Sequence, residues 1–196
     1  SKELLKTKCL PTKAKNNDFN GLGSNNIHLN DYIYFKLGTS EKHVSKNSML
    51  AQDDDYYFGK ILRIKKEDIL KKIDNKIDTL KADVFSKGHR APQGLTKIDQ
   101  LIFNVEHGPK GGDELNLVIK NGNYGWPLVS YGTNYLKQNG GDGKSIPTSH
   151  ELNNFNEPLL ALVPSIGISS LNNCPSVLKN YYKKKCLMAL SLYGNN

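Results

Sequence analysis

Arginine is the scarcest charged residue in this chain, since only Arg63 and Arg90 occur although lysine and arginine together number 27. The formal net charge is +8, and a value of that size can indicate nucleic acid or an anionic membrane as a partner. However, the lysines are scattered, the runs 71–72 and 183–185 are short, and no phosphate-binding motif accompanies them. We therefore predict no nucleic-acid partner.

Long apolar runs are also missing. A membrane-spanning helix needs about 20 mostly apolar residues, whereas the most apolar stretch, 159–168, is short and is interrupted by Pro164. The first residues, Ser-Lys-Glu-Leu-Leu-Lys, lack the apolar centre of a signal peptide. The sequence thus predicts no membrane span, and both ends look cut.

The chain contains three cysteines, an odd number that excludes a complete disulfide framework. Cys174 and Cys186 either pair across a loop in an oxidising compartment or remain as two buried thiols. Cys9 is left over in both cases. The spacing of the cysteines leaves these two alternatives open.

Short segments rich in β-branched and aromatic residues, each followed by Gly, Pro or Asn, predict an all-β fold. The expected strands cover residues 32–37, 59–65, 100–106, 114–119 and 185–192. Strand clusters near 27–64, 83–119 and 157–192 are spaced like successive four-stranded blades of a β-propeller. About three blades are too few to close a ring, so we expect residues 1–196 to be a partial propeller domain, truncated at both ends.

One segment has a different period. Apolar residues recur at helical spacing among lysines and aspartates: Ile69, Leu70, Ile73, Ile77 and Leu80. A surface helix inserted between strands and a polar connector with chance periodicity explain this pattern equally well.

Two turn-rich segments carry groups suited to ligand binding. In residues 88–95, Pro92 and Gly94 predict a bend that presents His89, Arg90 and Gln93 on a loop, and a guanidinium is well shaped to bind carboxylates. The alternative is a turn with solvated side chains.

Residues 106–114 combine a glycine-rich backbone with the carboxylates of Asp113 and Glu114 at their end. Backbone carbonyls and carboxylates are the ligands that Ca²⁺ prefers. A flexible acidic hairpin loop explains the same composition. A third segment, 121–127, holds the only tryptophan, Trp126, which we expect to be a packing anchor at a structural corner.

Three runs together carry a family resemblance: GHRAPQGL at 88–95, EHGPKGGDELNLV at 106–118 and NGNYGWPLVSYG at 121–132. In this order and spacing they resemble the signature of the soluble glucose/sorbosone (aldose sugar) dehydrogenases that depend on pyrroloquinoline quinone (PQQ). The resemblance extends over most of the chain from about Ile27. It implies a six-bladed β-propeller with PQQ at one end of the central channel.

The resemblance also implies roles for individual residues. Arg90 matches an arginine that contacts the PQQ carboxylates, Gln93 matches a supporting glutamine, and Ser165 falls where a hydroxyl faces PQQ. The backbone carbonyls of Gly108 and Pro109 match ligands of the calcium ion that also binds PQQ.

A second, structural calcium site is implied by Glu114 and Tyr124, although Asn134 stands where the family has another acidic ligand. Ala91 likewise occupies a position that is often Asn in the family, which removes one polar contact.

The implied function is the PQQ- and calcium-dependent oxidation of the CH–OH group of aldose sugars. A sugar substrate, an electron acceptor and a periplasmic or secreted location come with it. The family's proton-accepting His is absent at its expected place, near Asn20 or Gly21, while Asp18 and His28 lie nearby. The catalytic base therefore stays unassigned.

The alternative function is a non-enzymatic propeller of the same ancestry that binds calcium or a ligand. For residues 1–196 alone we expect no turnover.

Overall fold

The computed structural model describes residues 5–10, 25–40, 45–136 and 144–193. The fold is mostly β, and the two α-helices are short: α1 (Lys66–Ile73) and α2 (Ser176–Tyr182). The all-β prediction is confirmed at this level. Within the described ranges, no helix is long and apolar enough to cross a membrane.

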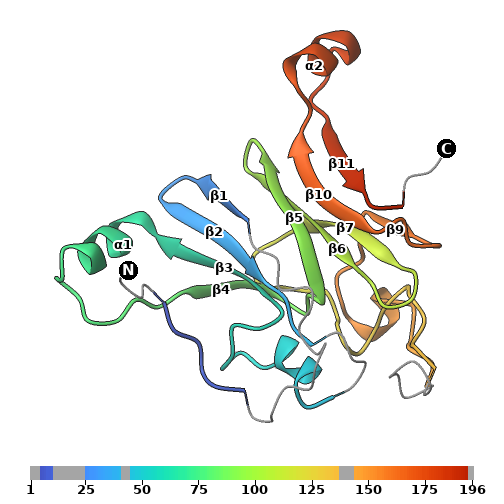
Figure 1. Cartoon of the computed structure of the whole chain (residues 1–196), viewed down its shortest axis with the longest axis horizontal. Coiled ribbons are helices and arrows are strands. Elements are labelled where there is room, and N and C mark those ends of the chain that lie inside the picture. Colours follow the sequence, from blue (N-terminus) through green and yellow to red (C-terminus); the bar gives the residue numbers. More distant parts are fainter. Residues whose placement is uncertain (1–4, 11–24, 41–44, 137–143, 194–196) are drawn as a thin grey trace.

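Three sheets lie side by side (Figure 1). The first has five strands in the order β1-β2-β3-β4-β8. Its strands are β1 (Asn26–Leu29), β2 (Tyr32–Leu37), β3 (Lys60–Lys65), β4 (Asp83–Lys87) and β8 (Gly122–Asn123). Neighbouring strands are antiparallel except for β4 and β8, which are parallel.

The second sheet is antiparallel, with strand order β5-β6-β7-β9. It consists of β5 (Ala91–Ile98), β6 (Leu101–His107), β7 (Asp113–Val118) and β9 (Leu160–Leu162). The third is the hairpin of β10 (Ile168–Asn173) and β11 (Leu187–Ser191). Two short 3-10 helices, η1 (Ser48–Ala51) and η3 (Glu151–Asn153), lie in the connections.

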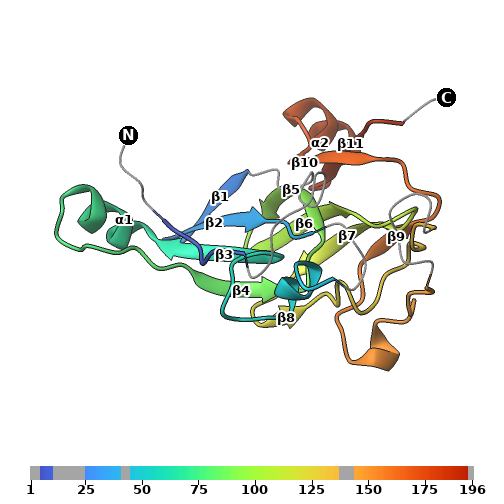
Figure 2. The same cartoon turned by 60° about the horizontal axis from the view of Figure 1, so that its bottom comes forward.

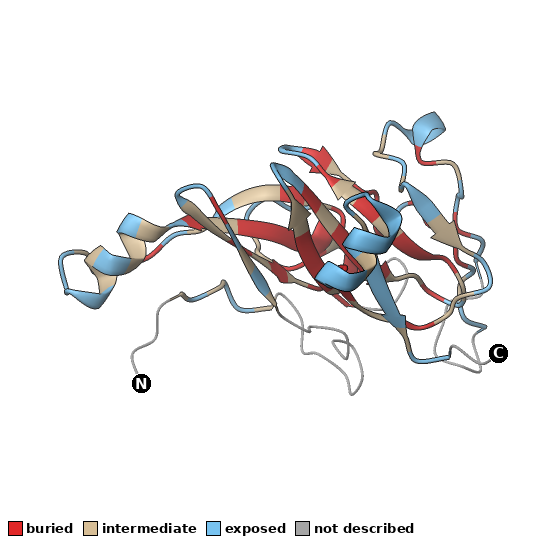
Figure 3. Cartoon of the chain, turned by 90° about the horizontal axis from the view of Figure 1, so that it is seen from above, coloured by how far each residue is buried: buried red, intermediate tan, exposed pale blue. Residues whose placement is uncertain are grey.

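Apolar side chains pack between the sheets. Figure 2 shows the sheets from a second direction, and Figure 3 shows that buried residues lie along their strands. One cluster joins the first sheet to the second: Leu29, Tyr34, Ile61, Leu95, Ile102 and Val118. A smaller one joins the second to the third: Val105, Ile168 and Leu171. Gly94 lets the last two sheets approach, because a Cβ there would meet the backbone of Leu171 on β10.

The structure corrects two expectations. Residues 88–95 are not one loop, because β5 begins at Ala91 and Gln93 is the extra residue of a β-bulge between Pro92 and Gly94. Pro92 has no N–H to give to the ladder, and a bulge is where a strand tolerates proline. Residues 83–87 were grouped with the second cluster, but they form β4 of the first sheet.

The periodic segment near residue 70 is a helix only in part. The helix α1 ends at Ile73, and Asn75 adopts a left-handed φ of 57° just beyond it. Ile77 and Leu80 therefore lie outside the helix. The number of blades in the whole protein and the truncation of its ends stay predictions.

Candidate functional site

A small cavity opens where the corner before β5 meets the loop between β6 and β7. Its volume is about 10 Å³, room for roughly one water-sized molecule or ion. Its lining residues are Gly88, Arg90, Glu106, His107, Gly108, Glu114, Tyr124, Trp126, Val129 and Ser130. The lining therefore includes Arg90, Gly108, Glu114 and Tyr124, four of the seven residues that the sequence nominated.

Arg90 lies directly on the loop between β6 and β7. Its Nη1 donates hydrogen bonds to the carbonyl oxygens of His107 at 3.1 Å and Gly108 at 2.8 Å. The guanidinium carbon lies 5.1 Å from the ring centroid of Trp126, which supports it from one side. The structure thus brings the predicted carboxylate-binding arginine into contact with the carbonyl of a predicted calcium ligand.

The corner that carries Arg90 is fixed by buried polar contacts. His89 is fully buried, its Nε2 lies 2.9 Å from Ser86 Oγ, and its ring stacks on Tyr124 at 4.7 Å. Glu106 accepts a hydrogen bond from the backbone N–H of Arg90 at 3.2 Å, and its Oε1 lies 3.4 Å from His89 Nδ1. The alternative of a solvated turn is therefore wrong for His89 and Arg90.

Two buried carboxylates face each other beside the cavity. Glu106 on β6 is paired in register with Glu114 on β7. The amide of Asn116 donates to both, at 3.0 Å to Glu106 and 3.3 Å to Glu114. Burial, and then the charge of Glu106, raise the pKa of Glu114 well above its ordinary value.

This donor set fits a hard cation such as Ca²⁺. The two carboxylates lie opposite each other, and residues of the loop between β6 and β7 line the same cavity and offer backbone carbonyls. Within the described ranges, no three His, Cys, Asp or Glu side chains converge as a metal-binding group. Any calcium here therefore depends on carbonyl oxygens in addition to the carboxylates.

Gly108 is required by the packing of its own loop. A Cβ at this position would meet the carbonyl oxygens of Gly111 and Gly112. Gly112 has a φ of 68° and packs its backbone against Gly132. The glycines therefore gather carbonyl oxygens into a tight cradle.

Tyr124 contributes to this region in a limited way. Its hydroxyl donates to the carbonyl of Leu117 at 2.5 Å and accepts from the N–H of Ile119 at 3.1 Å. Burial raises its pKa to about 12. Because the hydroxyl is engaged with the end of β7, only the backbone carbonyl of Tyr124 is suited to bind an ion.

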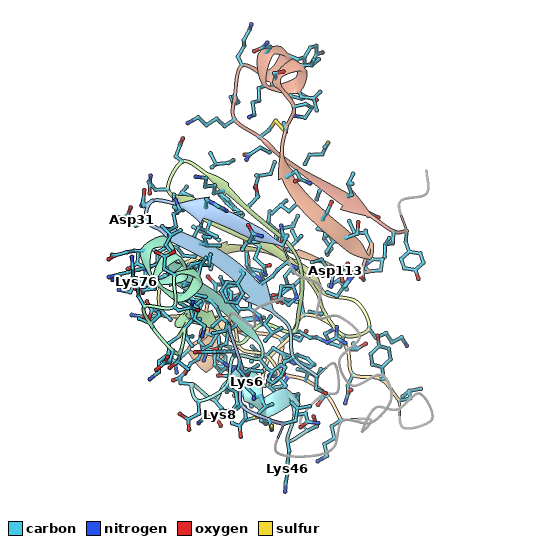
Figure 4. The ribbon with its side chains drawn as sticks, turned by 60° about the vertical axis from the view of Figure 1, so that its left-hand side comes forward. Lys6, Lys8, Asp31, Lys46, Lys76 and Asp113 are labelled. Carbon is cyan, nitrogen blue, oxygen red and sulfur yellow. A yellow bond between two sulfur atoms is a disulfide. The ribbon has the colours of Figure 1, made fainter. Side chains whose placement is uncertain are left out.

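Ser165 contacts the end of the loop between β6 and β7 through Asp113, the first residue of β7. Its hydroxyl is hydrogen-bonded to the carboxylate of Asp113, which also accepts the N–H of Ile168 at 2.9 Å. Burial alone would raise the pKa of Asp113, but hydrogen bonds from His107, Ser165 and Ile168 lower it to about 2. In Figure 4, Asp113 lies where the second sheet meets the β10–β11 hairpin. This carboxylate ties Ser165 to the loop that carries Gly108.

The remaining nominated residues are less central. The amide of Gln93 turns back to the carbonyl of Ala91 at 3.1 Å, and neither Gln93 nor Pro109 lines the cavity. His28 is on β1 and is exposed. Asp18, Asn20 and Gly21 lie outside the described residues.

Sequence reasoning missed several buried polar residues. Lys36 Nζ donates to the carbonyl of Pro92 at 2.6 Å, and burial lowers the pKa of Lys36 to about 8 despite the charge of Glu106. His150 is buried with Nε2 at 3.7 Å from Glu114 Oε1. The available signal was two polar residues in an otherwise apolar strand: Asn104 and Glu106 lie on the same face of β6, and both are buried.

Comparisons with known proteins agree with this geometry. The model of the family described as Glucose / Sorbosone dehydrogenase matches residues 6–192. Quinoprotein glucose dehydrogenase B of Acinetobacter calcoaceticus is 32% identical over 103 residues, which are 52% of this chain and 22% of that protein. An aldose sugar dehydrogenase of Escherichia coli is 36% identical over 109 residues, 53% of this chain and 28% of that protein.

Solved structures give the same result. A crystal structure of a glucose dehydrogenase superposes with a TM-score of 0.54 and 33% identity, covering 71% of this chain and 39% of that chain. The apo-form aldose sugar dehydrogenase of Escherichia coli gives a TM-score of 0.51 and 28% identity, over 72% of this chain and 40% of that one. The chain spans less than half the length of these relatives. It belongs to the Glucose / Sorbosone dehydrogenase family.

Proposed function

We propose that the protein containing this chain oxidises the CH–OH group of aldose sugars and depends on PQQ and calcium. The observation that carries this proposal is the contact of Arg90 Nη1 with the carbonyl of Gly108 at 2.8 Å. A guanidinium suited to a carboxylated cofactor and a carbonyl suited to calcium lie next to each other. Both groups border one small cavity.

Different residues of the chain would bind PQQ and the calcium ion. Arg90 would bind carboxylates of PQQ, and its position depends on Trp126 beside its guanidinium and on Glu106 at its backbone N–H. The carbonyls of Gly108 and Pro109 would hold the calcium ion. When bound, PQQ supplies the acceptor for the two electrons removed from the sugar.

Ser165 and Glu114 complete the proposed roles. Ser165 would face PQQ, because its hydroxyl is held by Asp113 on the loop that carries Gly108. Glu114 and the carbonyl of Tyr124 would bind a second calcium ion, since the carboxylates of Glu114 and Glu106 are both buried and the charge of Glu106 raises the pKa of Glu114. Gln93 would have a supporting role from its position in the bulge of β5.

Location and overall architecture belong to the same proposal. A periplasmic or secreted location is supported by the disulfide between Cys174 and Cys186, because such bonds persist in oxidising compartments. The sheets, in chain order, would be blades of a six-bladed propeller. An electron acceptor would reoxidise the cofactor after each turnover.

The test is reconstitution of the longest natural polypeptide that contains this chain. The protein is loaded with PQQ and Ca²⁺, and reduction of an artificial dye acceptor is followed after aldoses are added. We expect dye reduction that depends on PQQ, calcium and sugar together. A folded, PQQ-loaded protein that reduces no dye with a panel of aldoses would disprove the enzymatic proposal.

A non-enzymatic propeller would bind calcium or PQQ in the same experiment without turnover. No observation in the described part of the chain favours this second function. Residues 1–196 alone are expected to bind calcium without reducing dye.

A further inference from the structure

The β10–α2–β11 hairpin projects away from the rest of the molecule (Figure 1). Its tip is the segment between Cys174 and Cys186, which a disulfide closes at the base and which we call the α2 tip. The N–H of Cys174 also donates to the carbonyl of Cys186 at 3.0 Å. No residue of α2 is buried. The disulfide therefore fixes the shape of an exposed surface and not of a core.

Large apolar and aromatic side chains are exposed on the α2 tip. Val177 is 74% exposed, Tyr181 78% and Tyr182 59%. The rings of Tyr181 and Tyr182 lie 5.1 Å apart and perpendicular to each other. Tyrosine has an apolar ring and a polar hydroxyl, so it suits a boundary between a polar and an apolar phase.

The charge of the α2 tip has a single sign. It contains four lysines, Lys179, Lys183, Lys184 and Lys185, and no Asp or Glu follows Glu157 in the sequence. Lys185 pairs with Asp99 at 2.6 Å, while no ion pair joins the other three to any residue that the structure describes. The apolar apex therefore sits among four lysines, and in the described part of the chain only Lys185 forms an ion pair with an acid.

The other exposed helix shows that this arrangement is not general. On α1, Leu70 is 61% and Ile73 is 49% exposed, and lysines are also present. There, however, Lys71 pairs with Glu67 at 2.6 Å, and just after the helix Lys76 pairs with Asp74 at 3.1 Å. Acidic residues are thus interspersed with the lysines in and just after α1, whereas residues 175–185 contain no Asp or Glu.

We propose that the α2 tip docks on an anionic phospholipid surface. Lysines are attracted to anionic headgroups, and tyrosines and a valine at a protruding apex can enter the interface between headgroups and acyl chains. A lipid surface fits better than an acidic protein, because a stable protein interface needs about 800 Å² on each partner. A helix of seven residues on a protruding hairpin presents little continuous area for such a partner.

The first experiment is co-sedimentation of the purified chain with vesicles. Vesicles of phosphatidylglycerol mixed with phosphatidylcholine are compared with phosphatidylcholine alone, at low and high salt. We expect binding only to the anionic vesicles and weakening by salt. The double variant Lys183→Gln/Lys184→Gln should bind roughly thirtyfold more weakly. Its matched control on α1, Lys71→Gln/Lys72→Gln, should bind like the unchanged chain.

The second experiment reports insertion of the apex. Tyr181→Trp is expected to show a blue shift of its fluorescence when anionic vesicles are added, because Trp126 is buried and contributes a constant signal. Leu70→Trp on α1 is the control and should show no shift. Circular dichroism checks that each variant is folded.

Several results would overturn the proposal. These are no vesicle binding, binding that both lysine double variants weaken equally, and binding to an acidic protein without binding to vesicles. The readouts need neither PQQ nor sugar. Failure of the proposed oxidation and failure of membrane docking are therefore separate outcomes.

Discussion

Glu106 and Glu114 occupy directly opposed positions on β6 and β7, and the amide of Asn116 donates a hydrogen bond to each of them. Both carboxyl groups are buried, and burial together with the charge of Glu106 raises the pKa of Glu114. Two neighbouring acids in a buried site repel each other when both are ionised. A divalent cation at this position would remove that cost, which makes the pair the sharpest test of calcium binding.

Calcium should therefore stabilise the protein through Glu114. At a calcium concentration of about 100 times Kd, the expected gain is about 2.7 kcal/mol in the free energy of unfolding. Glu114→Gln should remove this gain and, in the presence of a chelator, raise stability by about 1 kcal/mol because the repulsion is lost. Thermal unfolding with and without calcium measures both effects. Glu151→Gln, on the exposed η3, is the control, and a full calcium effect in Glu114→Gln would contradict the assignment.

Arg90 should determine the affinity for PQQ. Hydrogen bonds to charged groups contribute about 1.5–3 kcal/mol, so Arg90→Met is expected to weaken PQQ binding about ten- to hundredfold. Isothermal titration of the calcium-loaded protein with PQQ measures the change. Arg63→Met provides a matched control, since Arg63 is the only other arginine and interacts with Tyr32 and Asp83 on the first sheet. Equal losses in the two variants would show that Arg90 has no special role.

The glycine cradle predicts a difference between two neighbouring substitutions. Gly108→Ala would force a Cβ against two carbonyl oxygens, whereas at Gly111 the nearest atom to a new Cβ is Val163 Cγ1 at 4.0 Å. Gly111→Ala is strained by its φ of 87° and should cost about 1 kcal/mol. Gly108→Ala should cost about 2 kcal/mol or more and abolish calcium binding. Chemical denaturation and calcium titration test this order, and the reverse order would argue against the cradle.

Lys60 predicts a pH dependence of stability. It is fully buried, its Nζ donates to the carbonyls of Leu50, Ala51 and Phe58 at 2.7, 3.0 and 2.9 Å, and burial lowers its pKa from 10.5 to about 7. Between pH 7 and pH 10.5 the unfolded chain therefore holds a proton that the folded chain has released. In this window the stability contributed by Lys60 rises with pH, and below pH 7 the contribution is constant and at its lowest.

The measurement compares the unchanged protein with Lys60→Met from pH 6 to pH 10. The difference in free energy of unfolding should move in favour of the unchanged protein by at most about 1.4 kcal/mol per pH unit above pH 7. Lys71→Met, on the exposed α1, should give a flat difference. If the difference in free energy of unfolding between the unchanged protein and Lys60→Met also stays constant with pH, the three carbonyls hold Lys60 in its ammonium form over the whole range, and the prediction is wrong.

The sequence identified the parts of the site that are local along the chain. Arg90 and Gly108 were nominated from two short motifs, and the structure brings them into contact. The strand at 32–37 was predicted with the bounds that the structure has, because alternation and β-branched residues are local signals. The local signals at 88–95 predicted a loop, and this was wrong in part. Pairing with β6 places Ala91 and Pro92 in a strand.

The pairing of the cysteines, by contrast, could not be decided from spacing. Cys174 and Cys186 lie at the base of one hairpin, with their Cα atoms 5.4 Å apart, and the register of β10 and β11 sets that distance. The same hairpin places Tyr181 and Tyr182 at an exposed tip. In the sequence these two tyrosines directly precede the short basic run 183–185, and nothing local indicated that they are exposed.

The sequence by itself determined the family, the β-rich class and the identity of the loop residues, because these depend on motifs of a few consecutive residues. Only the tertiary structure decided what those residues face. Glu106 gained its partners His89, Arg90 and Asn116 from other strands and corners. The physical reason is that burial and cross-strand contacts join residues far apart in the chain, and a local pattern does not specify such distances.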